Sequence, residues 1–170
     1  MAVKPKRRPI DPHRALRDHL VKLLGEGHAH VTFKDAIADW PPELQGTKPP
    51  GQPFTPWRLL EHIRISQWDI LEFTRNPKYE SPAWPAGYWP SSDAPPDAKA
   101  WDESVAQVER DLRATQRLVR DPGTDLFARI AHGTGQTVLR EALLVADHNS
   151  YHVGQLVLLK RLLGAWKDAR

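Results

Sequence analysis

The sequence predicts an all-α protein, a four-helix bundle with long proline-rich connections. Four long segments carry apolar residues at helical spacing, and no segment shows the alternating pattern that is typical of a β-strand. Two of the connections are long enough to cross from one end of a bundle to the other. The 170 residues fit a single domain, which we expect over residues 11–170, after a disordered basic arm over residues 1–10.

The first two predicted helices begin at clear capping signals. The Asp11 carboxylate can cap a helix that has Pro12 at its first position, and the apolar run then ends at Gly25. A short helix follows, in which Thr32 and Asp35 form an approximate capping box. These signals predict one long and one short helix before the first proline-rich stretch.

The second long helix is predicted from Thr55-Pro56 to about Arg75. Six prolines in residues 41–56 precede it, so we expect an extended connection there. Its inward face is expected to consist of Leu59, Ile63, Ser66 and Ile70. His62 and Asp69 lie beside that face, on nearly the same bearing and two turns apart. Such a pair fits either a site inside a bundle or the solvent boundary of the helix.

Two further long helices complete the predicted bundle. One spans residues 98–120, and the last runs roughly from Gln136 to Trp166. The last helix is apolar over much of its circumference, which predicts a central position with several neighbours. Residues 78–99, between the second and third long helices, mix prolines with aromatic residues. That composition indicates a packed loop, either a lid over a site or a cover for a helix face.

The composition restricts the classes of function. The chain has no cysteine, which excludes disulfides, thiolate ligands and a cysteine nucleophile, and suits the cytoplasm. No apolar run reaches the roughly 18 residues of a membrane span, so we expect no membrane association. The formal net charge is +3, and much of the excess lies in Lys4–Pro9. The prolines of that short arm favour a solubilising tail, so we expect no nucleic-acid binding.

Two histidines on the last helix form the most informative motif. His148 and His152 are four residues apart, which brings both imidazoles to one side of a helix, about 6 Å apart along its axis. Such a pair can bind one metal ion together, although a buried pair can also be satisfied by ordinary hydrogen bonds. Glu141 and Gln155 lie near the same bearing, and with Asp69 they are candidates to orient the ligands or to move protons.

A third ligand has to come from another helix, and His62 is the candidate because it leans inward at mid-helix. Three neutral imidazoles suit a divalent transition metal, zinc or nickel first and iron or copper as alternatives. The other histidines fit such a site less well. His13 and His19 are not spaced to meet, and His28 and His30 show no strand pattern around them.

Two segments of the chain together resemble the signature segments of the DinB-like family. They are Trp57-Arg58-Leu59-Leu60-Glu61-His62, with Trp68-Asp69 after it, and Asp147-His148-Asn149-Ser150-Tyr151-His152-Val153-Gly154-Gln155. The resemblance covers most of the chain. It implies a four-helix bundle, expected to be a homodimer, that holds one divalent metal through His62, His148 and His152.

Two functions follow from this resemblance and from the open coordination positions that three ligands leave. The first is a metal-dependent hydrolase or thiol-dependent transferase that activates water or a low-molecular-weight thiol against a small-molecule substrate. The alternative is a non-catalytic metal-binding module of a stress response, acting as a dimer or through a partner. A sealed site favours the alternative, and an open polar pocket beside the metal favours the enzyme.

Overall fold

The computed structural model describes residues 10–25 and 29–167. Within these residues all the regular structure is helical, apart from one isolated β-bridge between Arg129 and Thr137. The predicted all-α class is therefore confirmed. The elements are α1 (Pro12–Gly25), α2 (Phe33–Ile37), α3 (Pro56–Arg75), α4 (Ala100–Arg120) and α5 (Val138–Leu162), with 3₁₀ helices η1 (Pro42–Leu44) and η2 (Ala86–Tyr88).

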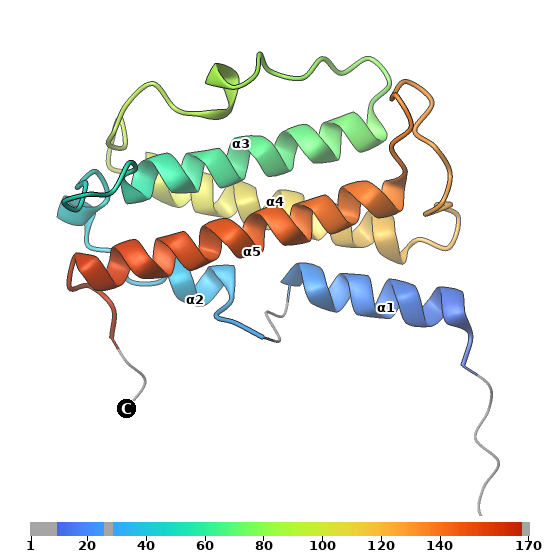
Figure 1. The fold of residues 1–170 in the computed structure, drawn as a ribbon, viewed down its shortest axis with the longest axis horizontal. Coiled ribbons are helices and arrows are strands. Elements are labelled where there is room, and N and C mark those ends of the chain that lie inside the picture. The colour runs from blue at the N-terminus through green and yellow to red at the C-terminus, as the bar shows by residue number, and fades with distance from the viewer. Residues whose placement is uncertain (1–9, 26–28, 168–170) are drawn as a thin grey trace, which may run out of the picture.

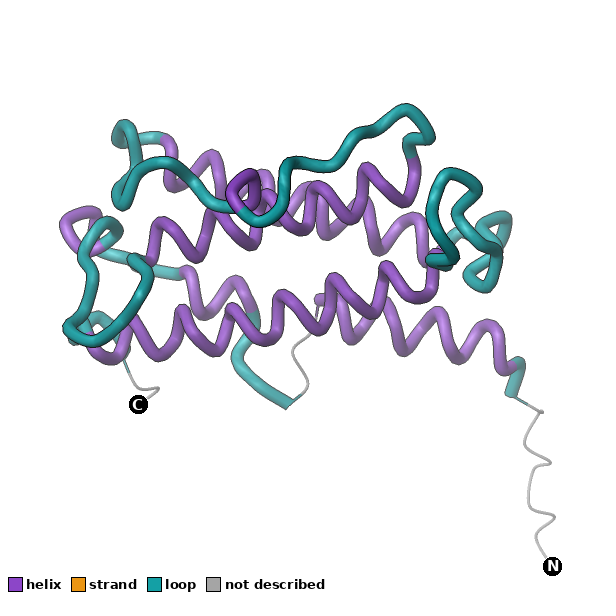
Figure 2. The backbone as a smooth tube through the Cα atoms, turned by 45° about the horizontal axis from the view of Figure 1, so that its top comes forward, coloured by secondary structure: helices purple, strands orange, loops and turns teal. Residues whose placement is uncertain are grey.

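The helices form a bundle with four sides. Three sides are α3, α4 and α5, and α1 and α2 together form the fourth, which we call the α1–α2 wall. The helices α3, α4 and α5 lie side by side, while α1 and α2 follow each other along one line beneath α5 (Figure 1). The chain runs in the same direction in α3 and α4 and in the opposite direction in α1 and α5 (Figure 1). The connection between α3 and α4 therefore returns along the whole of α3, and it is a crossover, as its length predicted (Figures 1 and 2).

Helix α5 is the central helix of the bundle, as its apolar circumference predicted. It packs against each of the other four α-helices. Its start is fixed by Thr137, whose hydroxyl accepts a hydrogen bond from the Arg140 backbone N–H at 3.2 Å. It ends four residues before the predicted Trp166, because Gly164 adopts a positive φ of 71° and turns the chain out of the helix.

The other predicted helix starts are also present. The Thr55 hydroxyl accepts from the Arg58 backbone N–H at 3.2 Å, with Pro56 at the first helical position of α3. The predicted capping box of α2 is formed by Thr32 and Asp35. The proline-rich stretch before α3 is less extended than predicted, because η1 and several turns fold it back.

The core consists of two apolar clusters that a buried polar link joins. The predicted inward face of α3 is buried at all four of its positions. Between the clusters lies Gln67, which has no exposed surface. Its amide nitrogen donates to the Val108 carbonyl at 2.7 Å, and its amide oxygen accepts from Asn149 at 2.6 Å. One side chain of α3 thus connects α4 and α5 at mid-bundle.

The surface leaves several predictions untested. The basic arm, apart from Ile10, lies outside the described residues, as does His28. None of the described helices combines the length and the apolar character needed to cross a bilayer. The outer face of α5 exposes four large side chains, Leu143, Tyr151, Leu158 and Leu162. The homodimer expected from the sequence stays a prediction.

We expect Arg17 to be the main polar link between α1 and the end of α4. Its guanidinium donates to the carbonyls of Val119 at 2.7 Å, Asp121 at 2.9 Å and Thr124 at 2.6 Å. Replacing Arg17 with Ala should lower the free energy of unfolding by about 1–2 kcal/mol, measured by urea denaturation, because it removes charge-assisted bonds to helix-end carbonyls.

The matched control is Arg14→Ala on the same helix. Arg14 is exposed, and its side chain forms a 3.9 Å ion pair with the exposed Asp18. Its replacement should change stability by less than about 0.5 kcal/mol. Equal effects of the two substitutions would contradict the role given to Arg17.

Candidate metal centre

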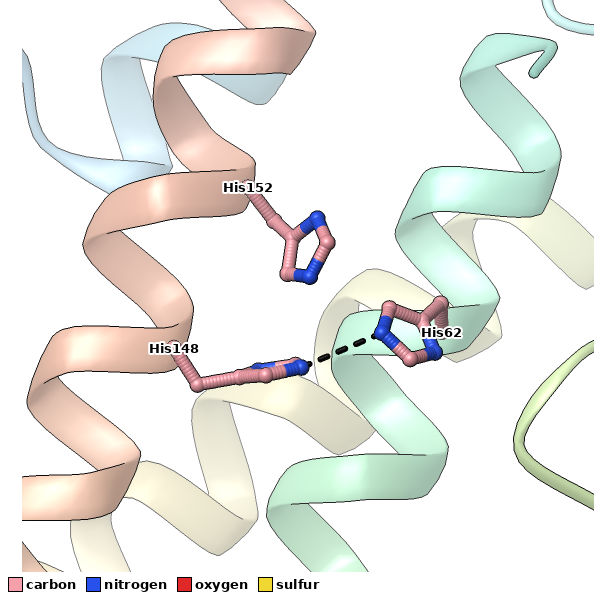
Figure 3. A group of neighbouring side chains, drawn as sticks. All are labelled: His62, His148 and His152. Carbon is pink, nitrogen blue, oxygen red and sulfur yellow. Dashed lines mark hydrogen bonds between the residues drawn. The ribbon is translucent and has the colours of Figure 1, made fainter. Parts of the chain in front are cut away.

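Three histidine side chains from two helices converge at one point between α3 and α5. His62 comes from α3, and His148 and His152 come from α5 (Figure 3). Each offers one ring nitrogen, and these three nitrogens all lie within 4.8 Å of one another. His148 Nε2 is 3.1 Å from His62 Nε2. In the part of the chain that the structure describes, this is the histidine cluster with the spacing of a metal site.

The orientation of the His62 side chain is fixed by residues that lie outside α3 and α5. Its Nδ1 lies 2.8 Å from the backbone carbonyl of Tyr88, which can only accept, so Nδ1 carries the proton. The Nε2 lone pair then points toward the two histidines of α5. Trp89 stacks on the imidazole with ring centroids 4.0 Å apart and planes 3° apart. One hydrogen bond and one stacked ring thus fix both the tautomer and the orientation of His62.

His152 is oriented in the same way by its own helix. Its Nδ1 lies 2.7 Å from the amide oxygen of Gln155, one turn further along α5. Nδ1 therefore donates there, and Nε2 again carries a lone pair. His148 differs, because its Nδ1 is buried and no hydrogen-bond partner for it lies among the described residues. Its ring is positioned by contacts with His62 and His152.

Burial keeps all three imidazoles neutral. The pKa of His148 is lowered to about 4, first by burial and then by the neighbouring His152 and His62. Burial also lowers the pKa of His62, against a smaller opposite effect of its bond to Tyr88. The pKa of His152 is lowered by burial too, opposed in part by Gln155. Three uncharged imidazoles are therefore available as ligands at neutral pH.

The donor set fits a divalent transition metal. Metal–nitrogen bonds of about 2.0–2.1 Å in a tetrahedral arrangement place two ligand nitrogens about 3.3 Å apart. The 3.1 Å between His62 and His148 is close to that value. Without an ion, the two nitrogens lie at hydrogen-bond distance, and a shared cation can take the place of the proton between them. The geometry and the neutral state of the cluster are thus both compatible with a metal site.

Residues 78–99, which we call the strap, cover this cluster. Besides the contacts of Tyr88 and Trp89 with His62, the Tyr88 hydroxyl donates to Asp69 at 2.8 Å. Trp89 also stacks on Phe54, with centroids 4.4 Å apart. Burial, followed by the bond to Asp69, raises the pKa of Tyr88 to about 12, so its hydroxyl remains a donor. The strap therefore covers a face of α3, as predicted, and its cover includes His62.

The three polar residues predicted beside the ligands lie in different places. Gln155 contacts His152 directly. Asp69 is buried and reaches His62 only through Tyr88, as the anchor of the strap. Glu141 is buried as well, and its carboxylate pairs with Arg140 at 2.8 Å. No hydrogen bond joins Glu141 to a histidine of the cluster in the described part of the chain, and its role stays a prediction.

The remaining described histidines lie elsewhere. His132 bonds to the Phe73 carbonyl at 2.7 Å, and His30 lies beside Ser150. His13 contacts Phe127. The sequence did not predict that Tyr88 and Trp89 are neighbours of His62. The aromatic side chains in residues 78–99 predicted only that this segment is a packed loop.

An all-helical bundle with a cluster of three histidines, a buried one on one long helix and a buried and a half-buried one on another, defines a class of small proteins that can hold a metal ion. The DinB superfamily matches the chain over residues 13–156, and the chain belongs to this family. The matched range contains all three histidines and the strap between them. No curated protein and no solved structure is similar enough to the chain to count as a match.

The metal-free protein should lose stability as the pH falls from about 6.5 towards 4. In this window the unfolded chain binds a proton at His148, whose ordinary pKa is 6.5, whereas the folded chain does not, because its pKa is about 4. The lowered pKa values of His62 and His152 act in the same direction. Urea denaturation of protein stripped with a chelator, repeated at several pH values, measures this dependence.

The variant His148→Ala provides the comparison. Its stability should fall less steeply than that of the wild type over the same pH window, because the variant lacks one histidine whose protonation is suppressed by folding. His132→Ala, at an exposed histidine, should retain the wild-type slope. If the stability of the wild type and of His148→Ala depends on pH in the same way, folding does not suppress the protonation of His148.

Proposed function

We propose that the protein binds one divalent transition metal through the Nε2 atoms of His62 and His152 and a ring nitrogen of His148. The observation that carries this proposal is the convergence of three neutral imidazoles whose ligand nitrogens lie within 4.8 Å of one another. Zinc and nickel suit three imidazoles best, and iron or copper are the alternatives. Membership of the DinB superfamily supports the same assignment.

The reaction class that fits this centre is hydrolysis or thiol-dependent transfer on a small electrophilic molecule. A divalent ion held by three protein ligands keeps positions open and supplies Lewis acidity that lowers the pKa of water or of a low-molecular-weight thiol. The chain's part is to hold the ligands. Gln155 and the Tyr88 carbonyl keep the protons of His152 and His62 on Nδ1, away from the ion.

The strap would also limit access to the centre. Trp89 occupies one face of the His62 ring, and the strap closes that side of the site to water. Asp69 anchors the strap through the Tyr88 hydroxyl. In this proposal a small substrate enters after the strap moves, and return of the strap excludes water from the reaction.

A non-catalytic metal-binding module is the second candidate, and one observation favours it. His62 and His152 are only 6% and 7% exposed, and His148 is half-buried, so most of the centre is covered. A module of this kind would keep its metal in a closed site and act as a dimer or through a partner. The two candidates differ in whether a thiol or substrate can reach the centre.

Replacement of a ligand should abolish stoichiometric metal. Protein purified without added metal and analysed for elements should contain about one divalent ion per chain, and His148→Ala should contain almost none, because two imidazoles bind too weakly. His13→Ala is the control, since its ring lies against Phe127 and away from the cluster. Full metal occupancy in His148→Ala would refute the ligand assignment.

A catalytic role requires turnover that depends on the metal. A screen of thiol and electrophile pairs should find an activity that is at least 100-fold lower in His148→Ala than in the wild type. Treatment of the wild type with a chelator should abolish this activity, and added zinc or nickel should restore it. His13→Ala should keep wild-type activity. Binding of thiols or azide to the metal can be followed through the absorption of a cobalt-substituted sample. If no such probe binds the metal, the non-catalytic module is favoured.

Loosening the strap should speed metal exchange. Tyr88→Phe removes the hydroxyl that bonds to Asp69 but keeps the backbone carbonyl that holds His62. Transfer of the ion to a coloured chelator should become about three- to tenfold faster, since the variant lacks one of the hydrogen bonds that restrain the strap. Tyr151→Phe, whose side chain is 66% exposed, should exchange metal at the wild-type rate. Equal rates for all three proteins would exclude the strap as the barrier.

A further inference from the structure

The α1–α2 wall is interrupted, and a cavity lies at the interruption. Helix α1 ends at Gly25 and α2 begins at Phe33, and the described residues between them, 29–32, are not helical. The cavity there has a volume of about 440 Å³. Its size is within the range of about 300–1,000 Å³ that is typical of small-molecule sites, and helix bundles place such sites between their helices.

The cavity has an apolar floor and a polar rim. Its floor consists of the buried side chains Leu24, Val108, Ala146 and Val153. Its rim carries the exposed side chains His30, Lys34 and Arg113. Glu109 is the carboxylate of the lining, and it lies 3.3 Å from Arg113. An apolar interior with a few polar groups at one edge is the usual construction of a site for an amphipathic molecule.

The cavity is distinct from the histidine cluster. Its lining on α5 includes Ala146, Asn149 and Val153, whereas His148 and His152 lie on another side of the same helix. The buried link from Asn149 to Gln67 stands between the two places. The cavity and the cluster thus lie at the same height of α5 and on different sides of it.

The edge of the cavity is built from bonded groups. His30 Nδ1 lies 2.8 Å from the Val31 carbonyl, and its Nε2 lies 3.1 Å from the Ser150 hydroxyl of α5. On the α1 side, the amide of Gln116 donates to the Val21 carbonyl at 3.1 Å. Hydrogen bonds therefore hold both ends of the interruption against the bundle, so the cavity has defined walls on both sides.

We propose that this cavity binds a small amphipathic carboxylate, with its hydrocarbon tail on the floor and its carboxylate at the rim. The charges at the rim favour an anion. Lys34 and Arg113 carry two positive charges against the single negative charge of Glu109. A guanidinium has five N–H donors, and the ion pair with Glu109 uses one of them, at Nη1. A carboxylate is therefore accommodated beside Arg113 without displacing Glu109.

Titration of the full chain with octanoate, followed by calorimetry and by amide chemical shifts in NMR, tests this proposal. Binding should saturate at one site, and the shifted amides should be those around the cavity. 1-Octanol, of the same length but without charge, should bind at least fivefold more weakly. Hexanoate should bind roughly tenfold more weakly than octanoate, because each buried methylene contributes about a three- to fourfold change in affinity.

Three variants locate the site. Ala146→Phe fills the floor and should reduce octanoate affinity at least tenfold. Arg113→Gln should reduce it about fivefold, while Arg117→Gln, an exposed arginine one turn further along α4, should stay within twofold of the wild type. Because Arg113 and Arg117 are both exposed, that pair reports on binding even if Ala146→Phe fails to fold.

Other outcomes overturn the proposal. Octanoate binding that Arg113→Gln and Arg117→Gln weaken equally, or that 1-octanol matches, would show that no carboxylate site exists at this rim. Loss of octanoate binding in His148→Ala would assign the carboxylate to the histidine cluster. Shifts confined to the exposed outer face of α5 would assign the tail to that surface.

Discussion

The packing of α3 against α5 is the constraint on which the rest of the structure depends. It brings His62 next to His148 and His152, where His62 and His152 are buried and His148 is half-buried. Imidazoles in such a place stay neutral, because burial opposes their charging. The Nε2 lone pairs of His62 and His152 then face His148, which has a single N–H as a neutral imidazole and can satisfy only one of them. Burying unsatisfied polar atoms costs free energy, and a bound cation is the group that offsets this cost best.

The strap adds a second constraint, because it supplies the hydrogen bond that orients His62. That bond goes to the backbone carbonyl of Tyr88, so it depends on the path of the strap more than on any one side chain. The path is fixed by the Tyr88 hydroxyl on Asp69, by Trp89 between His62 and Phe54, and by Asp93, which bonds to Thr55 and Arg58. Cover and ligand orientation are therefore one arrangement, and movement of the strap changes both.

The sequence predicted most of the fold because its signals are local. Thr55-Pro56 and Thr32 mark helix starts through hydrogen bonds within four residues, and the structure contains them. The meeting of His148 and His152 follows from their spacing on one helix. Contacts of the strap with His62 were not predictable in this way, since a loop carbonyl has no sequence signature and its position depends on tertiary packing.

The polar residues near the ligands show the same limit. Helical bearing placed both Glu141 and Gln155 on the side of the histidines, but bearing does not give distance along the axis. Gln155 lies one turn from His152 and bonds to it. Glu141 lies two turns, about 10 Å, before His148, and it pairs with Arg140 instead. Periodicity therefore identifies the face of a helix, and separation along the axis decides which residues of that face meet.

The buried link through Gln67 limits how the centre can open. Gln67 of α3 bonds to the Val108 carbonyl of α4 and to Asn149 of α5, one residue after His148. Separating α3 from α5 at this height would break a part-buried hydrogen bond and open the close-packed core, which costs several kcal/mol. Moving the strap away from His62 breaks the part-buried hydrogen bonds of Tyr88 with Asp69 and His62 and the stacking of Trp89, but it leaves the packing of α3 against α5 intact. Under the proposed function, movement of the strap is therefore the route to His62 that leaves the two helices together and keeps the ligands in place.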